Sequence, residues 1–227
     1  MKSPIIVALD MESKRALELA KKLNPQECKV KVGSQLFTAD GPMIIEKLNE
    51  LGFDIFLDLK FHDIPNTVKK AVEVAIKMGV WMLNVHSLGG KEMLRAACEV
   101  VEKASIKPLL VGVTVLTSLN DKALKEVGLG LNSENQVLLL AELCQAEGLN
   151  GVVCSANELS ILRKHLDKDF LLVTPGIRSS QLEMDDQKRI STASEAISNG
   201  ADYIVIGREI SNEIDPSEKI RQILETV

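Results

Sequence analysis

One stretch of the sequence gives the clearest indication of the fold: Asp54-Ile55-Phe56-Leu57-Asp58-Leu59-Lys60-Phe61-His62-Asp63-Ile64-Pro65-Asn66-Thr67-Val68. The apolar run at 55–59 predicts a strand, and Pro65 suits the first turn of a helix. Asp58 and Lys60 alternate within the strand, so both charges point to the same face. Asp63 follows beyond the strand. One strand-helix unit therefore brings two carboxylates and an amine to one strand end.

The same alternation of a short strand and an amphipathic helix runs along the whole chain. The predicted strands cover residues 5–9, 28–33, 55–59, 81–86, 109–115, 151–154, 170–173 and 203–206. The predicted helices cover 13–23, 42–51, 65–78, 91–104, material up to residue 147, 158–165, 192–199 and 216–226. Dividing 227 residues among eight units gives about 28 residues each, which is typical of a small (β/α)8 TIM barrel. We therefore expect a single α/β domain over residues 1–227, with an open doubly wound sheet as the alternative.

Polar residues at the ends of the predicted strands favour the barrel. In a barrel these ends form one rim around one pocket, whereas in an open sheet many of them would lie far apart. The residues in question are Asp10, Lys31, Asp58, Lys60, His86, Thr117, Ser118, Ser155, Thr174, Gly207 and Arg208. The sequence thus predicts an active site at the C-terminal ends of the strands.

Composition excludes several classes of function. Hydrophobic residues make up 45% and charged residues 26% of the chain, as in ordinary globular proteins. The net charge of −5, without a basic stripe, argues against nucleic-acid binding. No apolar run approaches the roughly 18 residues of a membrane span, and Asp10 comes too early for a signal peptide. The cysteines are widely spaced, at Cys28, Cys98, Cys144 and Cys154, so we expect free thiols in a cytoplasmic protein.

Two turns near the end of the chain predict a phosphate site. Strand 170–173 is followed by Thr174-Pro175-Gly176-Ile177-Arg178, and strand 203–206 leads into Gly207-Arg208. Barrels often bind phosphate between these two loops, and a guanidinium group matches phosphate geometry through paired donors. The alternative for either arginine is a surface ion pair. Residues 179–190 lack apolar periodicity and are long for a connection, which predicts a lid over this site.

The motif from Asp58 to Thr67 closely resembles the active-site signature of the orotidine 5'-phosphate decarboxylases. Without the resemblance, the same charges are equally well read as an ion pair that caps the strand. The resemblance extends from Asp10 to Arg208. It implies cofactor-free conversion of orotidine 5'-phosphate to uridine 5'-phosphate, the last step of UMP biosynthesis, with Lys60 protonating C6.

The resemblance also implies roles for individual residues. Lys31, Asp58, Lys60 and Asp63 would form one ionic network that keeps Lys60 charged, with Asp10 and Lys31 on the ribose hydroxyls. Taken alone, Asp10 could instead cap a helix and Lys31 could be a rim lysine. The nucleotide phosphate would be held by Pro175, Arg178, Gly207 and Arg208, with Gln187 bridging base and phosphate. The family forms homodimers in which Asp63 and Thr67 reach the partner's site.

Thr117 and Ser118 are placed to read the amide edge of a pyrimidine, although helix capping explains them equally well. Two positions depart from the family pattern. Glu209 stands where proline is usual, which puts a carboxylate beside the phosphate site, and Gln35 stands where an acid is common.

Two other functions fit part of the pattern. The spaced Asp-x-Lys-x-x-Asp core is shared by magnesium-dependent keto-gulonate-phosphate decarboxylases and hexulose-phosphate synthases. A barrel that binds nucleotides without turnover is the other alternative. The histidines, at His62, His86 and His165, lack metal-ligand spacing, so we expect no metal and a structural, hydrogen-bonded His86.

Overall fold

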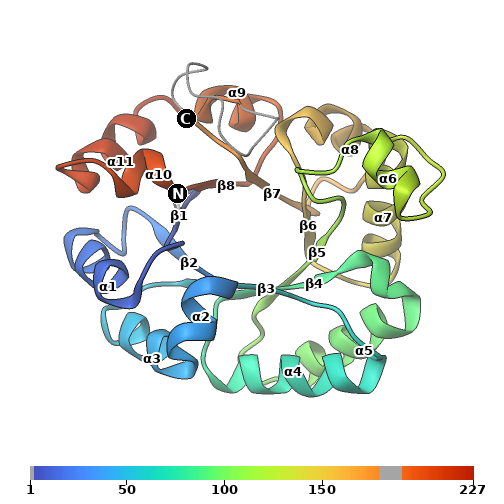
Figure 1. Cartoon of the computed structure of the whole chain (residues 1–227), viewed down its shortest axis with the longest axis horizontal. Helices are drawn as coiled ribbons and strands as arrows, with labels where there is room; N and C mark the ends of the chain where they lie inside the picture. Colours follow the sequence, from blue (N-terminus) through green and yellow to red (C-terminus); the bar gives the residue numbers. More distant parts are fainter. Residues whose placement is uncertain (1–2, 179–190) are drawn as a thin grey trace.

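The computed structural model describes residues 3–178 and 191–227. In this part of the chain, eight parallel strands close into a barrel in sequence order, with helices around it (Figure 1). The strands are β1 (Ile5–Ala8), β2 (Lys29–Gly33), β3 (Ile55–Phe61), β4 (Met82–His86), β5 (Leu109–Val113), β6 (Gly151–Val153), β7 (Leu171–Pro175) and β8 (Tyr203–Ile206). Because β1 pairs with both β2 and β8, the sheet has no edge, and the predicted TIM barrel is confirmed over the open sheet.

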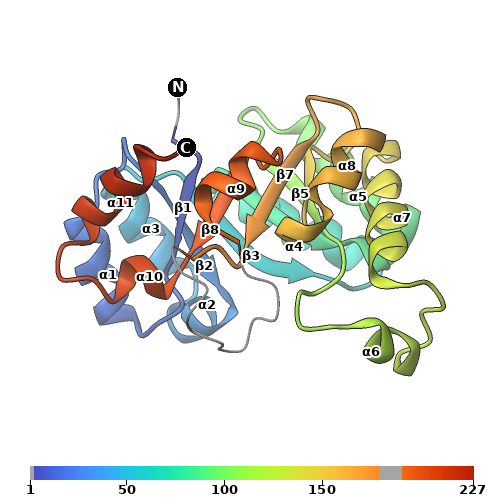
Figure 2. The same cartoon turned by 90° about the horizontal axis from the view of Figure 1, so that it is seen from above.

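The helices form the outer ring. They are α1 (Ser13–Lys22), α2 (Ser34–Asp40), α3 (Pro42–Glu50), α4 (Pro65–Lys77), α5 (Gly90–Lys103), α6 (Asp121–Glu126), α7 (Ser133–Ala146), α8 (Leu159–His165), α9 (Ala193–Ser198), α10 (Arg208–Ser211) and α11 (Pro216–Leu224), with 3-10 turns η1 (Ser87–Gly89) and η2 (Ala156–Glu158). Figure 2 shows α6 projecting on the side toward which the strands run. Sequence periodicity missed α2 and α10 because both are too short to show it. Across the described ranges, no helix has the length and apolarity needed to cross a bilayer.

The strands carry two apolar layers. The outer layer joins strands to helices, and the smaller inner one fills the barrel with Ile6, Ala8, Phe56, Met82, Val111, Val173 and Val205. The N-terminal end of the barrel is closed by Lys29, a buried side chain at 3% exposure. Its Nζ lies 5.1 Å from the Trp81 ring and 5.2 Å from the Tyr203 ring, and it donates a hydrogen bond to the Ser3 carbonyl at 2.8 Å. Among the described residues, side chains therefore fill this end of the barrel and the inner layer above it.

Strand β3 is irregular where it enters the site. Leu57 pairs with Leu83 and Phe61 with Val85, so three residues of β3 lie opposite the single residue Asn84 of β4. Such a bulge bends the strand and re-aims its side chains. Among the described residues, Lys60 is the only one other than glycine with a positive φ, at 51°. The strand predicted at 55–59 extends to Phe61 in the structure, because pairing with β4 resumes at Phe61 after the bulge.

Candidate active site

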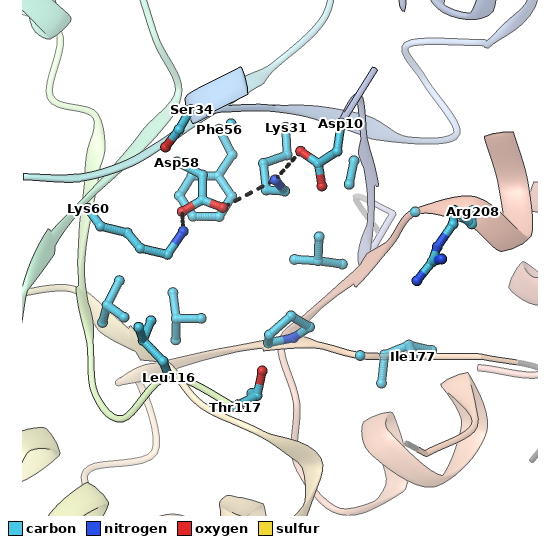
Figure 3. A pocket seen from close by; sticks show the side chains of 18 of the residues that line it. Asp10, Lys31, Ser34, Phe56, Asp58, Lys60, Leu116, Thr117, Ile177 and Arg208 are labelled. Carbon is cyan, nitrogen blue, oxygen red and sulfur yellow. Dashed lines mark hydrogen bonds and ion pairs between the residues drawn. The ribbon is translucent and has the colours of Figure 1, made fainter. Parts of the chain in front are cut away.

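A cavity of about 580 Å³ opens at the C-terminal ends of the strands (Figure 3). Apolar side chains from inside the barrel, among them Phe56, Val113, Val153 and Val205, form part of its lining. Nine of the residues predicted for the site also line it: Asp10, Lys31, Asp58, Lys60, Thr117, Pro175, Arg178, Gly207 and Arg208. They lie at or near the C-terminal ends of six strands, β1, β2, β3, β5, β7 and β8, which closure of the barrel brings together.

Four charged side chains alternate in sign along one wall of the cavity. Lys31 Nζ lies 2.8 Å from Asp10 Oδ1 and 3.2 Å from Asp58 Oδ2. Lys60 Nζ lies 2.6 Å from Asp58 Oδ1. Asp58 therefore bridges the two lysines, and the formal charges of these four groups sum to zero. Asp10 uses its carboxylate on Lys31, while the N-cap of α1 is Glu12, so the helix-cap alternative for Asp10 does not apply.

Burial and charge oppose each other in this wall. Burial would raise the pKa of Asp58, but Lys31 and Lys60 outweigh it and hold that pKa below its usual value. Burial would lower the pKa of Lys31, but Asp58 and Asp10 raise it above its usual value. The Lys31 side chain is 9% exposed and that of Asp58 is 14% exposed, so both charges are held in place by their partners. Lys31 and Asp58 are therefore both charged in the folded protein, and their ion pairs hold them in place.

Backbone geometry brings the charges this close. A Cβ at Gly33 would lie 2.8 Å from Asp10 Oδ1 and 3.1 Å from Lys31 Nζ, so a side chain there would displace the ion pair. Lys60 occupies the left-handed region, which costs a residue other than glycine about 1–3 kcal/mol. The remaining structure must hold this conformation, in which Lys60 Nζ donates a hydrogen bond to Asp58 Oδ1 at 2.6 Å.

The predicted phosphate side lies across the cavity from Lys60, where Figure 3 shows Arg208. Gly176 turns the chain after β7 with a φ of 82°, which favours glycine, and brings Arg178 to the cavity. Arg208 begins α10 directly after Gly207. The two predicted turns therefore converge, and both arginines line the same cavity.

Glu209 also lines the cavity, but its carboxylate forms an ion pair with another helix. Its Oε1 lies 3.3 Å from Lys219 Nζ on α11, and its side chain is 12% exposed. The negative charge that departs from the family pattern is thus neutralised locally, and it links α10 to α11.

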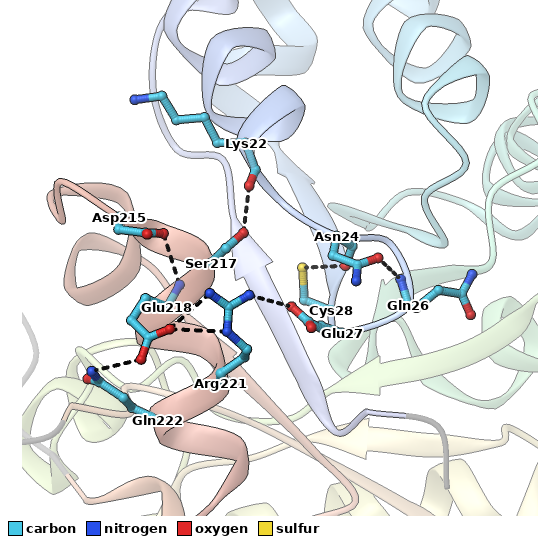
Figure 4. A network of polar contacts seen from close by, with 10 residues as sticks. All are labelled: Lys22, Asn24, Gln26, Glu27, Cys28, Asp215, Ser217, Glu218, Arg221 and Gln222. Atoms are coloured by element: carbon cyan, nitrogen blue, oxygen red, sulfur yellow. Dashed lines mark hydrogen bonds and ion pairs between the residues drawn. The ribbon is translucent and has the colours of Figure 1, made fainter.

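Helix α11 is itself tied to the first strand-helix unit (Figure 4). Ser217 Oγ donates a 2.6 Å hydrogen bond to the Lys22 carbonyl. Arg221 lies 2.9 Å from Glu218 Oε2 and 3.8 Å from Glu27 Oε2, between β2 and α11. Together with the ion pair of Glu209 with Lys219, these contacts connect the helix that begins at Arg208 to the first strand-helix unit.

Thr117 and Ser118 are separated by the structure. Thr117 lines the cavity, whereas Ser118 is exposed and lies outside its lining. Neither caps the next helix, because Asn120 is the N-cap of α6 and accepts a hydrogen bond from Ala123 N. Helix capping is therefore excluded as the reason for Thr117.

Two other predicted residues lie away from the charged wall of their own chain. Asp63 is exposed, and its Oδ1 accepts a 2.7 Å hydrogen bond from Ile64 N. Thr67 is exposed in the first turn of α4. The prediction of one network that includes Asp63 is thus not met within a single chain. Gln187 and the predicted lid lie outside the described residues.

His86 is hydrogen-bonded, as predicted. Its Nδ1 accepts a hydrogen bond from Leu88 N at 3.3 Å, and its ring stacks on His62 with centroids 5.2 Å apart. Burial, then His62 and the charge of Lys60, lower the pKa of His86 from 6.5 to about 4. The imidazole is therefore neutral at neutral pH.

This lowered pKa predicts an acid-sensitive contribution to stability. Between pH 6.5 and about 4 the unfolded chain binds a proton at His86 that the folded chain does not, so stability falls as pH falls. Between about pH 7 and about pH 5, we expect wild type to lose on the order of 1 kcal/mol more unfolding free energy than His86→Asn. Asparagine keeps an acceptor for Leu88 N. Urea unfolding measures the difference, with His165→Asn as the control, and equal losses in wild type and His86→Asn would contradict it.

Sequence reasoning missed Asn84 altogether. Its side chain is 1% exposed and hydrogen-bonds to both Lys60 and Asp58. A polar amide near the end of an apolar strand was the available signal, because such a group needs partners inside the protein. Ser34, Leu116 and Ile177 also line the cavity and were not predicted.

Comparisons with known proteins agree with this architecture. The sequence profile of the Orotidine 5'-phosphate decarboxylase / HUMPS family matches residues 3–223. The chain is 53% identical to orotidine 5'-phosphate decarboxylase of Dichelobacter nodosus, over 99% of each chain. It is 51% identical to that of Marinomonas sp., over 97% of this chain and 94% of the relative. The crystal structure of the Lactobacillus acidophilus enzyme superposes with a TM-score of 0.88 at 36% identity, covering 99% of this chain and 98% of that one. The chain thus belongs to the orotidine 5'-phosphate decarboxylase / HUMPS family.

Proposed function

We propose that this protein decarboxylates orotidine 5'-phosphate to uridine 5'-phosphate, the last step of UMP biosynthesis, without a cofactor. The observation that carries the proposal is the alternating wall of Asp10, Lys31, Asp58 and Lys60 opposite two arginine-bearing turns. One end of the cavity offers charge to a reacting centre and the other offers donors to a phosphate. Relatives of about half-identical sequence that carry this enzyme's name support the same assignment.

The chemical difficulty is the carbanion that forms at C6 when carbon dioxide leaves. The pyrimidine gives it no conventional electron sink, so the protein must supply the stabilising charge. We assign Lys60 to this role: its ammonium group stabilises the carbanion and then donates a proton to C6. Asp58, which accepts from Lys60 at 2.6 Å, keeps that ammonium charged and lies near the substrate carboxylate. Repulsion between the two carboxylates would then add to the tendency of carbon dioxide to leave.

The rest of the substrate is assigned to the other groups of the cavity. Asp10 and Lys31 bind the ribose hydroxyls, and Thr117 meets the amide edge of the base. Pro175, Arg178, Gly207 and Arg208 surround the phosphate, with Gln187 completing the contact between phosphate and base. Phosphate binding is remote from C6, so its binding energy helps to assemble the site around the reacting carbon.

We further propose a homodimer in which Asp63 and Thr67 complete the site of the partner subunit. Both residues are exposed at the start of α4, outside the cavity of their own chain. Between them lies Ile64, which is 67% exposed. In such a dimer, Ile64 would lie in the contact between the subunits and would be removed from water there.

Mixing two inactive variants tests the shared site. In a hybrid of Lys60→Ala and Asp63→Ala subunits, one site carries both lesions and the other carries neither. Random reassortment makes half of the dimers hybrid, so we expect about one quarter of wild-type activity. Lys60→Ala mixed with Asp58→Ala is the matched control, because both lesions fall in sites built by their own chains and no intact site can form. No recovery in the first mixture, with subunit exchange demonstrated, would argue against sharing.

The activity itself is tested by the fall in ultraviolet absorbance when purified protein in excess chelator meets orotidine 5'-phosphate. Rapid formation of uridine 5'-phosphate is the expected result. Activity on a sugar phosphate that disappears in chelator would instead support the magnesium-dependent enzymes that share the Asp58, Lys60 and Asp63 spacing. Tight binding of uridine 5'-phosphate without turnover would support a binding protein.

A further inference from the structure

We propose that Asn84 is a positioning residue, which aims the Lys60 ammonium group by holding the Lys60 main chain and the Asp58 carboxylate at the same time. The inference deepens the function proposed above and rests on it. Asn84 does not line the cavity, so the role assigned to it is to hold other residues in place and not to contact the substrate.

The hydrogen bonds of Asn84 form a closed link between the two strands. Its Oδ1 accepts from the Lys60 main-chain N–H at 2.7 Å, and its Nδ2 donates to Asp58 Oδ1 at 2.7 Å. The same Asp58 oxygen accepts from Lys60 Nζ at 2.6 Å. One amide therefore fixes both ends of the Lys60 residue, its main chain directly and its ammonium group through Asp58.

The bulge in β3 explains why such a link is needed. Three β3 residues, 58–60, face Asn84 alone, so regular pairing of the two strands is interrupted there. Lys60 also takes a left-handed conformation with a φ of 51°, which persists only where the surroundings hold it. Asn84 supplies this restraint at the strained residue itself.

The burial of Asn84 indicates that the role of its amide is to form these two hydrogen bonds. The residue is 1% exposed, where an unpaired amide would be unfavourable and a leucine of similar size would pack without that penalty. The amide oxygen and the amide nitrogen of Asn84 are both hydrogen-bonded, and both partners, Lys60 and Asp58, belong to the charged wall.

Two substitutions separate positioning from packing. Asn84→Leu keeps the number and branching of the side-chain heavy atoms without either hydrogen bond. Asn84→Asp keeps an acceptor for Lys60 N–H but places a second carboxylate against Asp58. We expect kcat to fall about 10- to 100-fold in each, with KM changed less than about threefold. Thr114→Val is the control, because Thr114 is fully buried and donates to the Val153 carbonyl at 2.9 Å without touching the charged wall.

The pH profile and hydrogen exchange add readouts that packing alone would not move. Asp58 is faced by Lys31 from β2 and Lys60 from β3, with Asp10 of the β1 end beyond Lys31 and His86 further along β4. In Asn84→Asp, the new carboxylate lies beside Asp58 and raises the pKa of Asp58. The acid limb of the pH profile of kcat should therefore shift to higher pH. Exchange of the Lys60 amide should be slow in wild type and in Asn84→Asp, and faster in Asn84→Leu.

Each outcome bears on one proposal. A wild-type protein without turnover would overturn the proposed function. If wild type turns over, two results would overturn the inference about Asn84 but not the proposed function. One is an unchanged kcat in both Asn84 variants, and the other is a loss of kcat no greater than that of Thr114→Val. Fast exchange of the Lys60 amide in wild type would overturn it as well. If Asn84→Leu does not fold, the nearly isosteric Asn84→Asp decides by its kcat, its pH profile and its Lys60 exchange.

Discussion

Lys60→Ala is expected to abolish turnover while leaving most nucleotide affinity. A general acid contributes about 10²- to 10⁴-fold, and a fixed charge at the developing carbanion contributes about 10²- to 10³-fold more, so the combined loss should be at least about 10⁴-fold. Binding should survive because Arg208 lies across the cavity from Lys60 and Arg178 also lines the cavity. Absorbance measures turnover, and titration calorimetry with uridine 5'-phosphate measures binding.

Lys107→Ala is the matched control for this variant. Lys107 Nζ lies 2.6 Å from Glu102 Oε2, the same distance as the ion pair of Lys60 with Asp58, but both partners are at least half exposed. Surface pairs of this kind contribute about 0–1 kcal/mol, so this variant should keep wild-type turnover and stability. Substantial turnover by Lys60→Ala would remove the lysine from the role of general acid.

Asp58→Asn is expected to damage both stability and turnover. The substitution leaves the ammonium groups of Lys31 and Lys60 without the carboxylate that they share. Breaking a buried ion pair costs about 3–5 kcal/mol of unfolding free energy, and we expect kcat to fall at least about 10²-fold because Lys60 loses its acceptor. Urea unfolding at neutral pH measures the first effect and the absorbance assay the second.

Asp10→Asn provides the comparison, since Asp10 contacts the same lysine but its side chain is 57% exposed. Its loss should cost about 1 kcal/mol or less. The pKa of Asp58 is lowered in the folded protein, so its contribution is present at neutral pH and is lost as pH falls below about 4. The difference in stability between wild type and Asp58→Asn should therefore shrink in acid. Equal destabilisation by the two substitutions would contradict the central role of Asp58.

The barrel was predictable because its evidence is spread along the chain. Each strand is short and apolar and each ends in a polar residue, so errors of two residues at a boundary do not change the topology. The strand predicted at 109–115 ends at Val113, for example, yet Thr117 still lines the cavity. The charges of the site were predictable for the same reason, since each lies at or beyond the midpoint of a short strand or within three residues after it.

What could not be predicted depends on geometry across strands. Asn84 gains its partners only because β3 bulges opposite it, and a bulge leaves little trace in the pattern of apolar residues. The ion pair of Glu209 with Lys219 joins two helices whose relative placement the sequence does not specify. The strand-end pattern placed Asp63 beside Asp58 and Lys60, whereas the family resemblance implied that it reaches the partner's site. Its exposed position follows from the path of the chain between β3 and α4.

The closed N-terminal end of the barrel has a practical consequence for spectroscopy. Trp81 is the only tryptophan of the chain, and it lies beside Lys29 and Tyr203, just before β4 begins. The residues of the cavity belong to the opposite strand ends. Tryptophan emission should therefore report on the integrity of the barrel while remaining nearly blind to occupancy of the nucleotide site, which makes it an intrinsic probe of unfolding that ligand does not disturb.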